Sequence, residues 1–256
     1  RRQRQMCIRD RGYIIDGTSA RIINFPTVEK TLEVVEKPEK KGNYKKNYKV
    51  GEKQEVYPFR TQEDLELMYN HFVEKKQYRN ALMFVIGINV GLRASDLLEL
   101  KWSQIFDEDG SIANGITVKE DKTEKFRTFY LNESCKTAII EYYNGLKKKP
   151  AKSEYVFSSR KGDGHIEVRP AGLILKNAAK AVGIKYNVGT HSMRKTFGYW
   201  QLKAHKDDAL FLCHLQEMFN HSSPQITLRY CGLAEEEMEQ YYNCLLYTSD
   251  AADDLI

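Results

Sequence analysis

The sequence lacks any long hydrophobic run. No apolar stretch among its 256 residues reaches the roughly 18 residues that a membrane-spanning helix needs, and no signal-peptide core lies near the start. Its five cysteines show no paired spacing and no CxxC motif, so the sequence supports neither a disulfide framework nor a zinc site. From these absences we expect a reducing, cytoplasmic setting.

A strong excess of charge of one sign is also missing. The net charge is +5, with 29% charged and 41% hydrophobic residues, which is enough apolar content for one large folded domain. This mild positive excess fits a nucleic-acid partner without demanding one. No carboxylate cluster suggests two-metal catalysis, so no metal or other cofactor is predicted.

Both ends of the chain differ from its body. Residues 1–11 (RRQRQMCIRDR) and 244–256 (CLLYTSDAADDLI) have no hydrophobic period that connects to their neighbours, and both resemble translated sequencing-adapter sequence. Native charged tails are the alternative interpretation. Residues 12–56 are polar and lysine-rich, which predicts a poorly ordered arm or the remnant of an N-terminal region. The expected folded domain is therefore residues 57–243.

Hydrophobic spacing predicts a mainly α-helical body. Thr61 precedes two acidic residues and an apolar set at helical spacing, which predicts that it caps a helix. Residues 77–90 are strongly apolar and predict a central helix that Gly91 ends. Further helices are expected at about 94–100, 133–147, 168–182, 190–204, 208–219, 224–231 and 234–243.

A β-hairpin interrupts the helices. The runs GITVKED (115–121) and FRTFYLN (126–132) have strand character and flank a polar turn. A third short strand, EYVFSS (154–159), is expected to pair with this hairpin. The predicted fold class is thus α+β, mainly α with one small antiparallel sheet.

Five residues carry the chemistry: Arg93, His191, Arg194, His221 and Tyr230. Taken singly, each has an ordinary interpretation as a capping, solvated or packing residue. Together they are the groups needed to break a phosphodiester without a metal, because guanidinium forks neutralise a phosphate, imidazoles hydrogen-bond it and a tyrosine oxygen attacks phosphorus. The first histidine and the second arginine are three residues apart on a predicted helix, so they share one face.

Three segments resemble the tyrosine recombinases, the phage-integrase family. GLRASDLLELKW (91–102) looks like the first arginine box of that family, and THSMRKTFGYW (190–200) looks like its His-x-x-Arg box. HLQEMFNHSSPQITLRY (214–230) looks like its closing box, with a histidine nine residues before the nucleophilic tyrosine. The resemblance covers about residues 57–243 and implies the fold of the family's catalytic domain.

Two features depart from the family's pattern. The family usually has glycine before the second histidine, where this chain has Asn220. Asparagine is the best non-glycine residue for the left-handed backbone expected there, and Ser223 and Pro224 suit the cap and start of the next helix. Family members also generally carry an α-helical DNA-clamping domain first, and residues 12–56 do not resemble one. Either the fragment is truncated or the protein is a catalytic-domain-only relative.

The resemblance implies a site-specific recombinase that cuts and rejoins double-stranded DNA for a phage or mobile element. Tyr230 would form a 3′-phosphotyrosine while Arg93 and Arg194 grip the scissile phosphate. His221 would donate a further hydrogen bond to that phosphate, and His191 would help to accept the tyrosine proton.

The departing 5′ oxygen also needs a proton. The resemblance assigns this role to Lys122 in the hairpin turn, with Lys125 as the competing candidate. Because the phosphotyrosyl bond conserves the phosphodiester energy, a second 5′-hydroxyl can rejoin the strands without ATP.

Other basic residues near these boxes are candidates for DNA-backbone contacts, although a solvated helix face explains any one of them equally well. They are Lys101, Lys119, Lys125, Arg127, Lys176, Lys180 and Lys195. The last helix carries Tyr241 and Tyr242 and is expected to dock onto a neighbouring protomer in a DNA-bound homotetramer. The resemblance also allows accessory DNA-bending factors as partners and implies a bacterial or phage-encoded, nucleoid-associated protein.

Two other functions fit much of the same sequence. A type IB topoisomerase has the same chemistry but relaxes supercoils as a monomer, so the pairing of two DNA sites would separate it from a recombinase. A DNA-binding regulator would bind without cutting. The complete set argues against a regulator, because a binder needs no tyrosine at that place: Arg93, Lys122, His191, Arg194, His221 and Tyr230.

Overall fold

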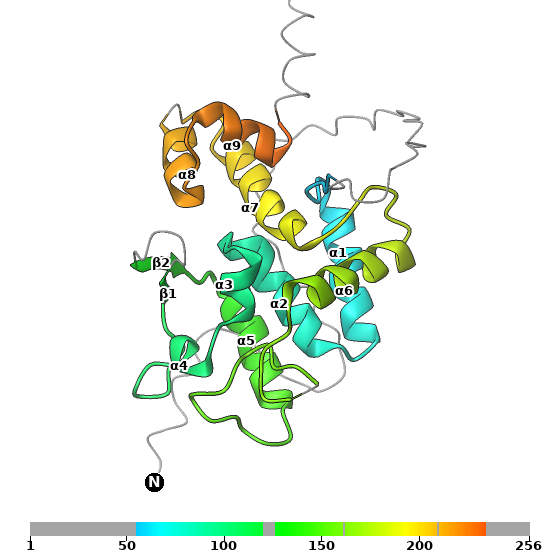
Figure 1. Ribbon diagram of the computed structural model, residues 1–256, viewed down its shortest axis with the longest axis vertical. Coiled ribbons are helices and arrows are strands. Elements are labelled where there is room, and N and C mark those ends of the chain that lie inside the picture. The colour runs from blue at the N-terminus through cyan, green and yellow to red at the C-terminus, as the bar shows by residue number, and fades with distance from the viewer. Residues whose placement is uncertain (1–54, 120–125, 161, 209, 234–256) are drawn as a thin grey trace, which may run out of the picture.

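The computed structural model describes residues 55–119, 126–160, 162–208 and 210–233 (Figure 1). These residues form helices and one small two-stranded sheet at the edge of the molecule, which confirms the predicted mainly α fold with a small antiparallel sheet. No helix in this part of the chain is long and apolar enough to cross a membrane. The elements in order are α1 (Gln62–Glu74), α2 (Tyr78–Val90), α3 (Ala94–Leu98), α4 (Trp102–Ile105), β1 (Gly115–Lys119), β2 (Phe126–Tyr130), α5 (Glu133–Gly145), α6 (Val168–Ala181), α7 (Thr190–Ala204), α8 (Phe211–Phe219) and α9 (Pro224–Cys231).

Helix α2 is the centre of the fold. Ten of its 13 residues are buried, and it packs against α1, α5 and α7. A helix covered on most of its sides carries an almost unbroken apolar sequence, which is why this segment was recognisable as a core helix. Gly91 ends the helix with a left-handed φ of 70°, and the chain then turns directly into Arg93 and α3.

Most helix boundaries agree with the sequence prediction. Thr61 caps α1 by accepting a hydrogen bond from the Asp64 amide at 3.1 Å. Helices α3 and α5 end two residues earlier than expected, and α8 begins three residues later, at Phe211. Helix α4 was missed because four residues are too few to show a helical period. The helix expected at 234–243 lies outside the described residues.

Strands β1 and β2 form the predicted hairpin. They pair antiparallel, with Gly115 opposite Tyr130 and Lys119 opposite Phe126. Figure 1 shows this hairpin on the same side of the molecule as α8. The turn that joins the strands lies outside the described residues.

The predicted third strand at 154–159 is wrong. In the described part of the chain the sheet has two strands, and the segment 154–159 makes isolated bridges instead, from Tyr155 to Lys101 and from Ser158 to His165. Val156 and Phe157 are completely or almost completely buried. The apolar run therefore fills the core beside α3 and α4, and its strand-like composition reflects burial rather than sheet pairing.

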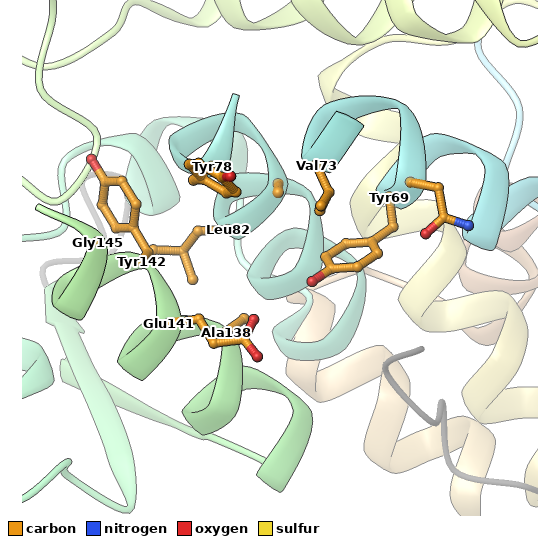
Figure 2. A pocket seen from close by; sticks show the side chains of 10 residues that line it. Tyr69, Val73, Tyr78, Leu82, Ala138, Glu141, Tyr142 and Gly145 are labelled. Atoms are coloured by element: carbon orange, nitrogen blue, oxygen red, sulfur yellow. The ribbon is translucent and has the colours of Figure 1, made fainter. Parts of the chain in front are cut away.

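A pocket of about 360 Å³ lies between α1, α2 and α5 (Figure 2). Three tyrosines and Glu141 help to line it, and burial together with this carboxylate raises the pKa of Tyr69 to about 12. None of the residues expected to act on DNA lines this pocket. The chemistry predicted from the sequence lies elsewhere, around α7 and α9.

A second, smaller core joins α7, α8 and α9. Its buried residues are Phe197, Leu215, Phe219 and Cys231. Helix α9 approaches α7 most closely at Gly198, where an added Cβ would lie 2.4 Å from the Cys231 sulfur and 2.9 Å from the Phe219 ring. The missing side chain therefore sets the distance between the two helices, and with it the position of Tyr230.

Gly198→Ala is expected to lower the free energy of unfolding by about 1–3 kcal/mol, because the new methyl overpacks this contact. Gly172→Ala in α6 is the matched control. Its Cβ would meet only Thr190, at 3.8 Å, and alanine is expected to stabilise a helix interior by about 0.5–1 kcal/mol. Chemical denaturation of both variants measures the difference, and equal effects would contradict the close helix contact.

Candidate active site

The fold brings the five predicted residues to one place. Arg93 occupies the N-cap position of α3, His191 and Arg194 lie in the first turns of α7, His221 lies between α8 and α9, and Tyr230 lies in α9. The His191 Nδ1 atom is 3.4 Å from the Tyr230 hydroxyl, and the His221 and Tyr230 rings are 5.0 Å apart between centroids. Residues from four separate segments thus line one site.

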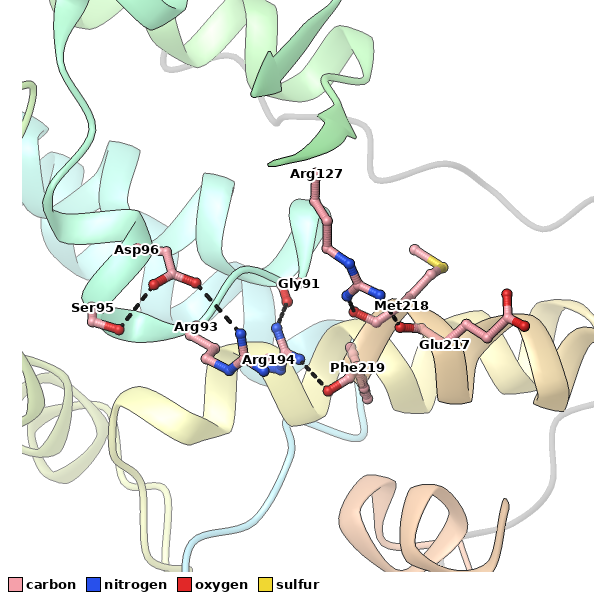
Figure 3. Close-up of polar contacts among 9 residues, drawn as sticks. All are labelled: Gly91, Arg93, Ser95, Asp96, Arg127, Arg194, Glu217, Met218 and Phe219. Atoms are coloured by element: carbon pink, nitrogen blue, oxygen red, sulfur yellow. Dashed lines mark hydrogen bonds and ion pairs between the residues drawn. The ribbon is translucent and has the colours of Figure 1, made fainter. Parts of the chain in front are cut away.

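Arg194 is buried, with 5% of its surface exposed. Its guanidinium donates to the main-chain oxygens of Gly91, at 2.5 Å, and Phe219, at 3.1 Å, and lies 4.4 Å from the Phe219 ring centroid (Figure 3). These contacts offset the cost of taking a charge out of water. The same side chain therefore joins α2, α7 and α8 and fixes a positive charge within the site.

Arg93 lies beside Arg194 but is more open, with its side chain 28% exposed (Figure 3). Its Nη1 atom is 3.9 Å from the Asp96 carboxylate, which also accepts a hydrogen bond from the Ser95 hydroxyl at 3.1 Å. Both arginines lie close enough to His221 for their charges to lower its pKa. Two guanidinium groups thus face one small region, as binding to a single phosphate requires.

Both histidines favour the neutral form. His191 keeps an exposed edge, but partial desolvation lowers its pKa, and the nearby charges of Arg194 and Lys195 lower it further. Burial and then the two site arginines lower the pKa of His221. The Thr227 hydroxyl lies 3.0 Å from the His221 Nδ1 atom and 3.4 Å from the Ser223 main-chain oxygen, so its proton can go to either; when it is donated to Nδ1, the ring proton is on Nε2.

Tyr230 is held as a protonated phenol. Burial raises its pKa to about 12, against the opposing effects of Arg194 and Arg93. Its ring packs edge-on against Phe219 at 5.5 Å, and the Lys195 ammonium lies 5.5 Å from its centroid. A phenol of this kind becomes a nucleophile only when a neighbouring base takes its proton, and the nearest described base is His191.

The turn between α8 and α9 has the backbone expected from the sequence. Asn220 has φ 53° and ψ 48°, the left-handed conformation for which glycine or asparagine is suited. Ser223 then caps α9 by accepting from the Ile226 amide, and Pro224 is the first helical residue. The predicted left-handed backbone at Asn220 and the predicted start of the next helix at Ser223 and Pro224 are confirmed. This turn places His221 in the site.

The sequence profile of the phage integrase family matches residues 59–237, which is more than half of the chain. Probable integrase/recombinase YoeC of Bacillus subtilis (strain 168) is 36% identical over 187 residues, which make up 73% of this chain and 95% of YoeC. This chain belongs to the phage integrase family.

Two solved structures share the fold of this chain. The crystal structure of XerA recombinase matches with a TM-score of 0.57 and 19% identity, over 75% of this chain and 65% of XerA. XerH site-specific recombinase, bound to a palindromic difH substrate in a post-cleavage complex, matches with a TM-score of 0.56 and 21% identity, over 72% of this chain and 51% of XerH. The predicted catalytic-domain fold is confirmed, and the chain spans about half the length of other curated relatives named tyrosine recombinases.

The residues predicted to contact the DNA backbone differ in their surroundings. Four of the seven lysines and arginines have exposed side chains, consistent with either a solvated surface or a DNA contact: Lys101, Lys119, Lys176 and Lys180. Lys122, the expected proton donor, and Lys125 lie outside the described residues. All of these assignments stay predictions.

Two further DNA-backbone candidates also make contacts within the protein, and their assignment to DNA stays a prediction. Lys195 is 9% exposed, and its Nζ atom lies 3.6 Å from the Glu55 carboxylate as well as near the Tyr230 ring. Arg127 is half-buried, and its guanidinium donates to the main-chain oxygens of Glu217 and Met218 (Figure 3). Sequence reasoning missed these internal roles because a charged residue near a motif looks the same whether it faces solvent or a helix end.

Proposed function

We propose that this protein is a site-specific DNA recombinase that cuts and rejoins strands through a covalent bond to Tyr230. The observation that carries the proposal is a phenol oxygen 3.4 Å from an imidazole that favours its neutral form, next to two arginines. The names of its relatives, a probable integrase/recombinase and several tyrosine recombinases, support it, as does the DNA substrate in the XerH complex. Double-stranded DNA is the proposed partner.

In the first step the Tyr230 oxygen attacks the scissile phosphorus. A phosphorus–oxygen bond to the tyrosine forms, and the bond to the 5′ oxygen of the next nucleotide breaks. His191 accepts the phenol proton, while Arg93 and Arg194 stabilise the charge that grows on the non-bridging oxygens. His221 donates from Nε2 to one of these oxygens.

The leaving 5′ oxygen takes up a proton in the same step. Lys122 is the proposed donor, and Lys125 is the alternative. The phosphotyrosyl ester has about the energy of the phosphodiester it replaces, so a 5′-hydroxyl from another strand reverses the step and joins new ends without ATP. We further propose that residues 57–243 form the catalytic domain and that a DNA-bound homotetramer, with accessory bending factors, integrates or excises a phage or mobile element.

The cleavage rate is expected to fall at acidic pH, and the midpoint of this acid limb of the pH–rate profile should lie below pH 6.5. The proton-accepting form of His191 is the neutral one, and its pKa lies below the ordinary value of about 6.5. The neutral form therefore predominates at pH 7, and activity is lost only as the pH falls through the lowered pKa. Initial rates at subsaturating DNA report this pKa for the free protein.

His191→Asn is the control for that assignment. It is expected to slow cleavage by about 100-fold or more and to remove the acid limb, because the titrating base is gone. An acid limb with its midpoint above about 6.5, or one that persists in the variant, would assign the limb to another group.

The function is tested with a library of nicked duplexes that carry randomised sequence around the nick. When cleavage occurs just before the nick, the short 5′-hydroxyl fragment diffuses away and the covalent complex accumulates. A recombinase is expected to enrich a discrete, inverted-repeat sequence in complexes that survive denaturing detergent. The enriched duplex then serves as the substrate in all other assays.

The same experiment separates the two alternatives. Covalent capture with little sequence preference, together with relaxation of supercoiled DNA by a monomer, would favour a type IB topoisomerase. Retention of DNA without any covalent complex would favour a binding regulator. Pairing of two enriched duplexes in one protein complex, measured by energy transfer between labelled DNAs, is expected only for the recombinase.

A further inference from the structure

The last turn of α8 has a donor for each of its final carbonyl oxygens. A helix leaves its last four carbonyls without internal partners, and here they belong to residues 216–219. Main-chain amides of the following turn reach the first two. Arg127 donates to the oxygens of positions 217 and 218 at 2.5 and 3.0 Å, and Arg194 donates to Phe219 at 3.1 Å (Figure 3).

Apart from these arginines, helix α8 is held by the small apolar core that it shares with α7 and α9. Among its nine residues only Leu215 and Phe219 are buried. Arg127 comes from β2, so its two guanidinium hydrogen bonds connect the hairpin to the end of α8. A paired guanidinium contact is stronger and more directional than a single donor, and a cation at a helix C-terminus also meets the negative end of the helix dipole.

His221 is hydrogen-bonded to this same turn. Its amide donates to the Gln216 oxygen at 3.0 Å, and the Gln216 side chain donates back to the His221 oxygen at 3.0 Å. Tyr230 is anchored differently, since α9 packs directly on α7 at Gly198. The Tyr230 ring also packs against Phe219 at the end of α8, at 5.5 Å, but His221 is hydrogen-bonded to this turn, so we expect a displacement of the α8 end to move the histidine more than the tyrosine.

We propose that Arg127 is a positioning residue for DNA cleavage: its fork holds the last turn of α8 against β2 and so places His221 at the scissile phosphate. The inference rests on the proposed function. A direct contact between Arg127 and the DNA backbone is the competing explanation, and it predicts different measurements. A backbone contact needs only a charge, whereas a fork across two carbonyls needs the planar guanidinium.

The first test compares Arg127→Lys with Arg79→Lys. Arg79 also donates to a main-chain oxygen, that of Ser158, but from the opposite end of α2, about 18 Å from Gly91. With the enriched duplex, Arg127→Lys is expected to lower the single-turnover cleavage rate by about 10- to 100-fold, as misplacement of a catalytic group does. Its DNA affinity and salt dependence are expected to match wild type, and Arg79→Lys is expected to keep the full rate.

A double-mutant cycle with His221→Asn tests whether Arg127 acts through the histidine. If it does, Arg127→Lys should slow a protein that already carries His221→Asn by no more than about 3-fold, because the placed group is absent. The remaining readout needs no activity. Amide hydrogen exchange in residues 216–221 should be faster in Arg127→Lys than in wild type or in Arg79→Lys.

Each other result overturns the proposal. A wild-type rate in Arg127→Lys would show that charge alone is enough, which is the result expected of a backbone contact, and a weaker DNA affinity would show that Arg127 acts in binding. Fully multiplicative rate losses in the cycle would mean that Arg127 acts independently of His221. If the wild-type protein forms no covalent complex, the proposed function fails, while the exchange measurement still decides whether Arg127 holds α8.

Discussion

Tyr230→Phe is expected to reduce covalent capture of the enriched duplex by at least about 10⁴-fold, to background, while leaving noncovalent binding intact. Only the phenol oxygen is removed. The ring keeps its edge contacts with Phe219 at 5.5 Å and His221 at 5.0 Å, so the site should keep its shape. Denaturing gel analysis measures the capture, and fluorescence anisotropy measures the binding.

A second tyrosine controls for the loss of a hydroxyl in general. The Tyr186 hydroxyl donates to the Asp64 carboxylate at 2.9 Å, away from the cluster around α9. Tyr186→Phe is expected to cost about 0.5–1.5 kcal/mol of stability but to keep covalent capture. A Tyr230→Phe protein that still becomes linked to DNA would mean that another of the 16 tyrosines, or another residue type, is the nucleophile.

Features with a local cause were predictable from the sequence. Gly91 and Asn220 end their helices because the left-handed backbone favours these residues, and Thr61 and Ser223 start helices through their own side-chain oxygens. The apolar segment of α2 could be recognised as central because burial on most sides removes polar positions. The five candidate site residues were recognisable through the resemblance of whole boxes, not through any single residue.

Features that depend on distant partners were not predictable. The burial of Arg194 follows from carbonyls at Gly91 and Phe219, which belong to other helices. The contact of Arg127 with α8 spans about 90 residues of sequence, and nothing near it distinguishes a helix cap from a DNA contact. The segment 154–159 was predicted to be a strand from its apolar composition, but these residues pack in the core without joining the sheet.

The two site arginines are expected to respond differently to the same substitution. Arg93→Lys should slow cleavage by about 100-fold, because a transition-state contact worth about 3 kcal/mol is lost with the fork. Its side chain is 28% exposed and lies 3.9 Å from Asp96, so the free energy of unfolding should change by less than about 0.5 kcal/mol. Single-turnover cleavage and chemical denaturation of the same preparation measure both effects.

Arg194→Lys should lose at least as much activity and, in addition, stability. A lysine cannot serve the oxygens of Gly91 and Phe219 together, and one unsatisfied buried carbonyl costs about 1–3 kcal/mol. For a domain of this size that loss corresponds to a melting temperature lower by roughly 2–12 °C. The contrast with Arg93→Lys is the decisive result. Equal stability of the two variants would mean that Arg194 does not join α2 to α8, and full activity in either would mean that the phosphate is held by other groups.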